Sequence, residues 1–191
     1  MTPLAPDERA RRFEDTALPF MQALYGTALR LTADPEEAAD VLQETWLRAY
    51  RTFDNFRSGT NAKAWLFKIL YSVWINRRAK ARREVGPLPV DELERRYGLL
   101  VDATVEDSGA LEAWGERWPR EIESALRALP EVFRAAVLLV DVQQLSYEAA
   151  AAALDCPVGT LQSRLFRGRR QLFAALADYA RRTGYLKPVE P

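Results

Sequence analysis

The stretch LSYEAAAAALDCPVGTLQSRLFRGRRQL, residues 145–172, predicts two helices joined by a tight turn. Ser146 is suited to cap the first helix, whose alanine run favours helix formation. Pro157 follows the short turn and fits the first turn of the second helix, where its missing N–H is not needed. Because the first helix has small side chains, the second can approach it closely. The stretch therefore predicts a helix-turn-helix.

The second helix of this pair has one apolar and one polar face. Its expected apolar stripe consists of Val158, Leu161, Leu165, Leu172 and Leu176. The opposite face carries Thr160, Ser163, Arg164, Arg167, Arg170 and Gln171, and no acidic residue occurs from Pro157 to Ala177. A charged face is usually only solvated. Arginine pairs with guanine edges or phosphates, however, so this face beside this turn favours contact with DNA.

The composition of the 191-residue chain excludes several kinds of chemistry. It contains no histidine and only one cysteine, Cys156, so an intrachain disulfide and histidine catalysis are excluded, and a Cys/His zinc site nearly so. We expect no enzyme activity, no cofactor and no bound metal. No apolar run has the length of a membrane span, and residues 1–16 lack the apolar segment of a secretory signal. We expect a cytoplasmic protein that does not insert into a membrane.

The charges are balanced overall but unevenly distributed. There are 27 basic and 27 acidic residues, yet residues 77–83, RRAKARR, hold five bases in seven positions. Residues 84–123 hold eleven acids and four arginines, with scattered prolines and glycines. This segment, with a net charge of −7, predicts an acidic linker between two basic helical modules.

Two helices are expected within residues 23–56. Asp34, Pro35 and Glu37 form the start signal of the second, an aspartate variant of the capping box. Its inward stripe is Ala38, Leu42, Thr45 and Ala49, and its outward residues are Asp40, Gln43, Glu44, Leu47, Arg48 and Arg51. A mixed polar face of this kind normally contacts solvent.

A long helix is expected from near Asn61 to residue 83. Leu66, Ile69, Leu70 and Val73 are its expected core face, whereas Phe67, Tyr71, Trp74 and Arg78 share another face. An aromatic stripe is often core. Here it is interleaved with Lys63 and Lys68 and runs into the basic segment, which favours stacking of unpaired bases.

The helix-turn-helix resembles region four of the extracytoplasmic-function (ECF) sigma factors of bacterial RNA polymerase, which share a pattern LSYEEIA…CPVGTVKSRLxRAR. In that family the second helix reads the promoter −35 element. The resemblance implies −35 contacts within a helix-turn-helix of about residues 146–165 and just beyond, at Thr160, Gln162, Ser163, Arg164, Phe166, Arg167, Arg169 and Arg170. Gln162 stands where the family often has a basic residue.

The stretch DVLQETWLRAYRTF, residues 40–53, resembles region two of the same family, which docks on the clamp of the polymerase's largest subunit. The resemblance implies contacts with core polymerase by Asp40, Gln43, Glu44, Leu47, Arg48 and Tyr50. GTNAKAWL and INRRAK, residues 59–66 and 75–80, resemble the loop and helix that melt the −10 element. The implied −10 contacts are Arg57, Asn61, Lys63, Phe67, Tyr71, Trp74, Asn76, Arg77 and Arg78.

The resulting expectation is an all-α alternative sigma factor with two small helical domains. Region two is expected over residues 15–83, a flexible acidic linker over 84–121 and region four over 122–180. Core RNA polymerase and promoter DNA are the implied partners. The GTNAKAWL pattern is typical of members controlled by zinc-containing anti-sigma factors, so an anti-sigma factor, possibly zinc-containing, is a further implied partner.

Several alternatives remain open. A free-standing helix-turn-helix regulator would bind DNA without polymerase, and a helical scaffold would bind no nucleic acid. The linker could enter the polymerase channel, hold the two modules together in an autoinhibited state, or act only as a spacer.

Overall fold

The structure is a computed structural model, and it describes residues 6–57, 59–85 and 118–186. These residues form helices and turns and contain no strand. We call the first half the N-terminal module: α1 (Pro6–Ala17), η1 (Leu18–Phe20), α2 (Met21–Thr32), α3 (Pro35–Thr52), η2 (Phe53–Asn55) and α4 (Ala62–Val85). We call the second half the C-terminal module: α7 (Arg120–Ala128), α8 (Glu131–Val137), η4 (Leu138–Val142), α9 (Tyr147–Ala153) and α10 (Val158–Arg182). The all-α fold class is confirmed.

Side-chain caps begin the helices where the sequence predicts them. Asp34 accepts a hydrogen bond from the backbone N–H of Glu37 at 2.8 Å, which satisfies one of the free donors at the start of α3. The second half of the expected capping box differs, because the N–H of Asp34 bonds to the hydroxyl of Thr32. Asn61 and Ser146 cap α4 and α9 by accepting from the N–H three residues on.

Prolines separate the short helices of the C-terminal module. α7 ends at Ala128, and α8 begins at Glu131, directly after Pro130. Pro157 directly precedes α10 and is its N-cap, one position earlier than predicted. α8 continues into η4, a π-helical turn, and Gln143 follows it. Such turns are rare and recur at functional positions.

α1 was not among the helices expected from the sequence. Phe13 of this helix is buried and makes edge-to-face contacts with Trp46, Tyr50 and Phe53, at ring-centroid distances of 5.8, 5.2 and 5.3 Å. The helix therefore belongs to the N-terminal module, ahead of the boundary predicted at residue 15. Ala10, Phe13 and Ala17 recur at helical spacing and were the available signal.

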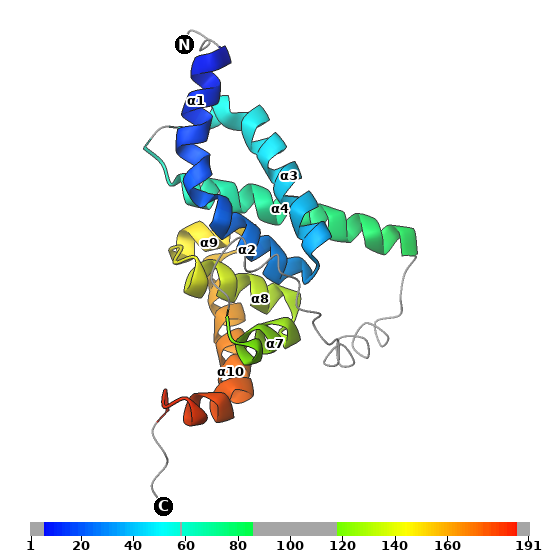
Figure 1. The fold of residues 1–191 in the computed structure, drawn as a ribbon, viewed down its shortest axis with the longest axis vertical. Helices are drawn as coiled ribbons and strands as arrows, with labels where there is room; N and C mark the ends of the chain where they lie inside the picture. The colour runs from blue at the N-terminus through cyan, green and yellow to red at the C-terminus, as the bar shows by residue number, and fades with distance from the viewer. Residues whose placement is uncertain (1–5, 58, 86–117, 187–191) are drawn as a thin grey trace, which may run out of the picture.

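The two modules pack directly against each other. α4 contacts α9, and α2 contacts α7 and α8, so both modules contribute to one hydrophobic cluster (Figure 1). α1 lies at one end of the long axis and the last turns of α10 at the other. Residues 86–117, most of the predicted linker, lie outside the described residues, so its flexibility and path remain predictions.

Candidate nucleic-acid interface

The helix-turn-helix of α9 and α10 buries part of the expected stripe. Leu161 and Leu165 are buried, and Leu172 and Leu176 are half-buried. Val158, in the first turn of α10, is exposed, so its predicted place in the apolar stripe that packs inward is wrong. Because the four leucines of this stripe pack inward, the opposite face of α10 points outward.

Most of the residues implied in −35 binding do lie on this outward face. The exposed ones are Gln162, Ser163, Phe166, Arg167, Arg169 and Arg170, whereas Thr160 and Arg164 are half-buried. Phe166 is 67% exposed, which is unusual for a large apolar ring. A Cβ added at Gly159 would meet no atom within 4 Å, so the start of α10 is open. The face combines basic, hydrogen-bonding and aromatic groups that can approach a groove.

Arg169 differs from its neighbours because it is held within the module. Its Nε and Nη2 donate to the two carboxylate oxygens of Asp141 at 3.0 and 2.5 Å. The hydrogen bonds to Asp141 raise the pKa of Arg169 further above its usual value. This bidentate pair ties α10 to η4. Asp141 carried no sequence signal, because it lies 28 residues from Arg169.

Gly168 lets α10 approach α8 closely. It is buried, and a Cβ at this position would lie 3.0 Å from a methyl carbon of Val137 and 3.4 Å from the carbonyl oxygen of Phe133. No pattern in the sequence indicates this role for a glycine that lies between two arginines. Its role depends on a helix that precedes it by about thirty residues.

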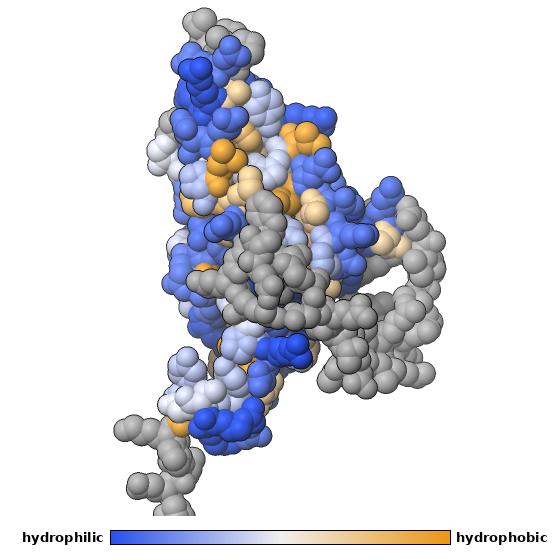
Figure 2. Space-filling model, in the orientation of Figure 1, coloured by the Kyte–Doolittle hydropathy of each residue, from blue (hydrophilic) through white to orange (hydrophobic). Residues whose placement is uncertain are grey.

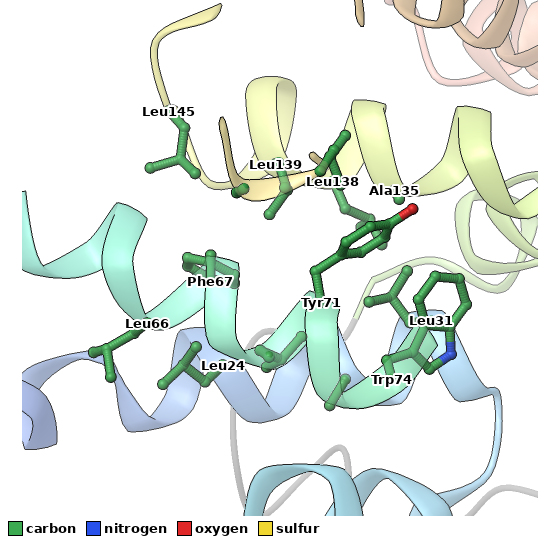
Figure 3. Close-up of a cluster of buried hydrophobic side chains, with 14 of the residues drawn as sticks. Leu24, Leu31, Leu66, Phe67, Tyr71, Trp74, Ala135, Leu138, Leu139 and Leu145 are labelled. Carbon is green, nitrogen blue, oxygen red and sulfur yellow. The ribbon is translucent and has the colours of Figure 1, made fainter. Parts of the chain in front are cut away.

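The aromatic residues implied in −10 binding are buried, which contradicts the expected exposed stripe. Phe67 and Trp74 are 0% and 1% exposed and Tyr71 is 9% exposed. Phe67 and Tyr71 project from α4 towards Leu138 and Leu139 of the C-terminal module (Figure 3). α4 is therefore covered on two sides, by α2 and α3 within its own module and by the C-terminal module. Helical periodicity could not distinguish such a covered face from a free aromatic one.

Trp74 is a core residue in this arrangement. Its ring lies beside Leu31 and Tyr71, with a ring-centroid distance of 5.4 Å to Tyr71 (Figure 3). Its indole N–H is buried and has no hydrogen-bond acceptor among the described residues. A base could not stack on this ring without rearrangement of the core.

The polar members of the −10 set fall into two groups. Arg57, Asn61 and Asn76 are exposed at the ends of the 57–61 loop and on α4. The other three are half-buried and already paired: Lys63 with Gln143, Arg77 with Asp40 and Glu44, and Arg78 with Glu131. Burial lowers the pKa of Lys63. It raises the pKa of Tyr71, an effect that the nearby positive charge of Arg164 opposes.

The residues implied in polymerase binding lie along one face of α3. Asp40, Gln43 and Leu47 are exposed, and Glu44, Arg48 and Tyr50 are half-buried. Leu47, at 51% exposure, lines a hollow of about 400 Å³ together with Tyr25, Ala39, Leu42, Gln43 and Trp46. Hydrophobic surface also appears over α3 in Figure 2. Tyr50 is partly covered by α1, since the guanidinium of Arg9 lies 4.4 Å from its ring centroid.

The described residues contain no group of three His, Cys, Asp or Glu side chains placed to hold a metal ion. None of their helices combines the length and the apolar character needed to cross a bilayer.

Comparison with known families gives two matches along the chain. The Sigma-70 region 2 model matches residues 19–84, and the Sigma-70 region 4 model matches residues 120–172. These ranges contain α2–α4 and the helices of the C-terminal module up to the middle of α10.

Curated relatives carry the same assignment. The chain is 35% identical over 162 residues to the ECF RNA polymerase sigma factor EcfG of Rhodopseudomonas palustris, covering 85% of this chain and 83% of that protein. It is 33% identical over 188 residues to the RNA polymerase sigma-H factor of Pseudomonas aeruginosa, covering 90% and 89%. It is 34% identical to the ECF sigma factor SigE of Mycolicibacterium smegmatis, covering 84% of this chain but only 60% of the length of that relative.

Solved structures extend the likeness to the arrangement of the helices. The sigma factor RpoE of Bartonella quintana, in complex with the anti-sigma factor NepR, superposes with a TM-score of 0.69 at 29% identity, covering 87% of this chain and 98% of that one. CnrH, in complex with the cytosolic domain of CnrY, shares the fold with a TM-score of 0.58. Sigma factors are non-enzymatic initiation factors, in agreement with the predicted lack of enzyme activity. The chain therefore belongs to the ECF family of RNA polymerase sigma factors.

Proposed function

We propose that this chain binds core RNA polymerase, directs it to specific promoters and promotes melting of the DNA there. The observation that carries the proposal is the outward face of α10, where Gln162, Ser163, Phe166, Arg167 and Arg170 are exposed on the second helix of a helix-turn-helix. The arginine side chains on this face can pair with guanine edges and with phosphates when the helix enters a major groove. We assign the −35 contacts to this face.

The proposed polymerase surface is the outer face of α3. Leu47 and the hollow beside it offer apolar area, and Asp40, Gln43 and Arg48 surround it with polar groups. An apolar centre with a polar rim is the usual composition of a protein interface. α3 does not depend on this face for its packing, because Ala38, Val41, Thr45 and Ala49 are buried on the other side.

The proposed −10 surface consists of the 57–61 loop and α4. Arg57 and Asn61 are accessible as the modules stand, whereas Lys63, Phe67, Tyr71 and Arg78 require separation of the modules. We assign Trp74 a structural role and not a stacking role.

Regulation by an anti-sigma factor is also proposed. The Bartonella relative is bound to such a protein, and the GTNAKAWL sequence of residues 59–66 supports a zinc-containing one. We expect these partners to meet in the cytoplasm, where the polymerase is.

Reconstitution with core polymerase tests the proposal against its rivals. The purified chain should produce RNA from specific start sites on genomic DNA only when core polymerase is present, with start sites preceded by a shared pair of elements. Sequence-specific DNA binding by the chain alone, without effect on the polymerase, would favour a free-standing regulator. No effect of DNA and no binding to polymerase would favour a helical scaffold.

A further inference from the structure

The helix α1 precedes the part of the chain that matches the family. It covers Pro6–Ala17, whereas the match to region 2 begins at residue 19. The surfaces proposed above for DNA and polymerase include no residue of this helix. α1 is nevertheless anchored in the N-terminal module, because Phe13 is buried against aromatic rings of α3 and of the turn that follows it. These contacts suggest what α1 contributes to function.

Two of the rings that Phe13 contacts also belong to the proposed polymerase surface. Trp46 lines the hollow beside Leu47, and Tyr50 is one of the implied polymerase contacts. Phe13 meets these two rings edge to face, with interplanar angles of 87° and 80°. Edge-to-face contacts between aromatic rings are favourable and directional. Phe13 therefore supports Trp46 and Tyr50 from the side of α1 and limits the orientations that they can adopt.

Arg9 holds the end of α3 through three contacts. Its guanidinium carbon lies 4.4 Å from the centroid of the Tyr50 ring, and its Nη2 donates a hydrogen bond of 2.6 Å to the backbone carbonyl of Tyr50. Its Nε donates one of 3.0 Å to Asp54 in η2. A cation beside the last carbonyls of a helix is also favoured by the helix dipole. The planar, forked guanidinium allows one side chain to make all three contacts, and a lysine amine lacks this geometry.

The packing of α3 within the module leaves these rings at the edge of its buried stripe. The buried residues of α3 are of small or moderate size: Ala38, Val41, Thr45 and Ala49. Trp46 and Tyr50 lie one helical turn apart beside this stripe and are half-buried. A large side chain at such an edge has a defined rotamer only where a neighbouring element restricts it. For Trp46 and Tyr50, α1 is such an element.

We propose that Arg9 and Phe13 are positioning residues for the binding of core polymerase. They act by holding Trp46 and Tyr50 in the orientations that shape the α3 surface. The hollow beside Leu47 keeps its form only while the ring of Trp46 stays in place. This inference rests on the proposed assignment of the outer face of α3 to polymerase, and it adds α1 to the polymerase-binding unit.

Loss of this support lowers the fraction of molecules whose α3 surface is ready to bind. An apparent dissociation constant is the intrinsic one divided by that fraction, so a fall to about one tenth weakens binding about tenfold. Because the rings reorient faster than polymerase arrives, the association rate falls by the same factor and the dissociation rate is unchanged. A variant that is less stable but still folded changes neither rate.

The test measures binding of the full-length chain to core polymerase by surface plasmon resonance. Arg9→Met removes the three contacts and keeps a long side chain, whereas Arg9→Lys keeps the charge. Phe13→Leu keeps an apolar side chain and removes the ring contacts. Arg11→Met is the matched control, because Arg11 is exposed on the same helix. Circular dichroism and urea unfolding show which variants are folded.

Arg9→Met and Phe13→Leu are expected to associate about tenfold more slowly than wild type, with an unchanged dissociation rate. Arg9→Lys should lie between them and wild type, and Arg11→Met should equal wild type. If Phe13→Leu does not fold, Arg9→Met carries the test, since the Arg9 side chain is 21% exposed. Wild-type association rates in the folded variants would overturn the proposal. An equal loss in Arg11→Met would also overturn it, because α1 would then contact polymerase directly.

A double-mutant cycle with Leu47→Ala shows where Arg9 acts. Leu47 lines the same hollow as Trp46, so the combined loss of binding free energy should be smaller than the sum of the two single losses. Full additivity would mean that Arg9 does not act through this hollow, and it would overturn the proposal.

Leu47→Ala alone tests the assignment on which the inference rests. If Leu47→Ala weakens binding and Arg9→Met does not, the polymerase surface on α3 stands and only the positioning role is rejected. If Leu47→Ala binds polymerase as the wild type does, the assignment of the α3 face fails and the inference fails with it.

Discussion

The amine of Lys63 lies 2.6 Å from the carbonyl oxygen of Gln143, eighty residues further along the chain. This bond joins a residue of the −10 set to the residue that follows the π-helical turn of the C-terminal module. Gln143 is buried and Lys63 is half-buried, and this burial lowers the pKa of Lys63. The side chain of Lys63 therefore takes part in the packing of the two modules, and it is also a proposed contact of promoter DNA.

Replacement of Trp74 tests its assignment to the core. Trp74→Ala removes a buried ring and should destabilise the protein by about 3–5 kcal/mol. Trp74→Phe keeps most of the ring and removes an indole N–H that has no acceptor among the described residues, so it should cost clearly less. Urea unfolding followed by circular dichroism gives both values. If both substitutions lower the free energy of unfolding by equal, small amounts, Trp74 is not a core residue.

Two glycines of α10 should respond to alanine in opposite directions. Gly168→Ala gains helix propensity but forces a Cβ against Val137 and Phe133, and overpacking of this kind costs about 1–3 kcal/mol. Gly159→Ala meets no atom and should stabilise the chain by about 0.4–1 kcal/mol. Thermal and urea unfolding of the two variants provide the comparison. A stabilised Gly168→Ala variant would show that α8 and α10 do not pack this closely.

The pKa of Tyr71 predicts how the stability of the fold depends on pH. Burial raises this pKa above its ordinary value of 10.0, so the folded chain favours the neutral phenol. The stabilisation is fully present below pH 10 and is lost as pH rises through the raised pKa. The lowered pKa of Lys63 acts in the opposite direction. The folded chain binds this proton less tightly than the unfolded chain, so stability rises as the pH increases through the lowered pKa towards 10.5.

Absorbance at about 295 nm isolates the tyrosine contribution. The difference between the titration curves of wild type and Tyr71→Phe should show one phenol that ionises at a pH above the ordinary pKa of tyrosine. In urea-unfolded wild type, the same phenol should titrate at its ordinary value of 10.0. A wild-type Tyr71 that already titrates normally would contradict its burial.

Arg167 and Arg169 should affect DNA binding in different ways. Arg167 is exposed on the outward face, and Arg167→Ala should cost about 1–3 kcal/mol if it makes a bidentate base contact, specifically at its own −35 position. Arg169 is held by Asp141, so Arg169→Ala and Asp141→Ala should weaken holoenzyme binding by similar amounts through the orientation of α10. Footprinting with holoenzyme measures both. The double variant should be less than additive; full additivity would mean that Arg169 acts on DNA directly.

The α3 face should be needed for polymerase binding and not for folding. Leu47→Glu places a charge in the centre of the proposed apolar surface and should weaken binding to core polymerase by tenfold or more, since desolvation of a charge at an interface is costly. Leu18→Glu is the matched control, as Leu18 is similarly exposed but lies on η1. Co-elution with core polymerase and circular dichroism separate binding from folding. If Leu47→Glu still co-elutes with core polymerase, this face does not bind polymerase and contacts only solvent.

The sequence alone determined the features that depend on neighbours within one turn. The caps at Asp34, Asn61 and Ser146 each join a side chain to an N–H three residues away, and the break at Pro130 follows from a missing donor. The exposed arginines of α10 follow from the period of the helix, because Leu161 and Leu165 must face inward. These features depend on local geometry and can therefore be predicted from the sequence.

Only the tertiary structure decided what covers each apolar face. Periodicity marked Phe67, Tyr71 and Trp74 as one stripe of α4 but could not say whether solvent, DNA or another helix lies against it. The answer depends on contacts such as Thr27 with Gln143 and Arg30 with Glu123, which are 116 and 93 residues apart. Such pairs form only when two helical surfaces adopt the relative placement that satisfies their buried polar groups, and no local pattern encodes that placement.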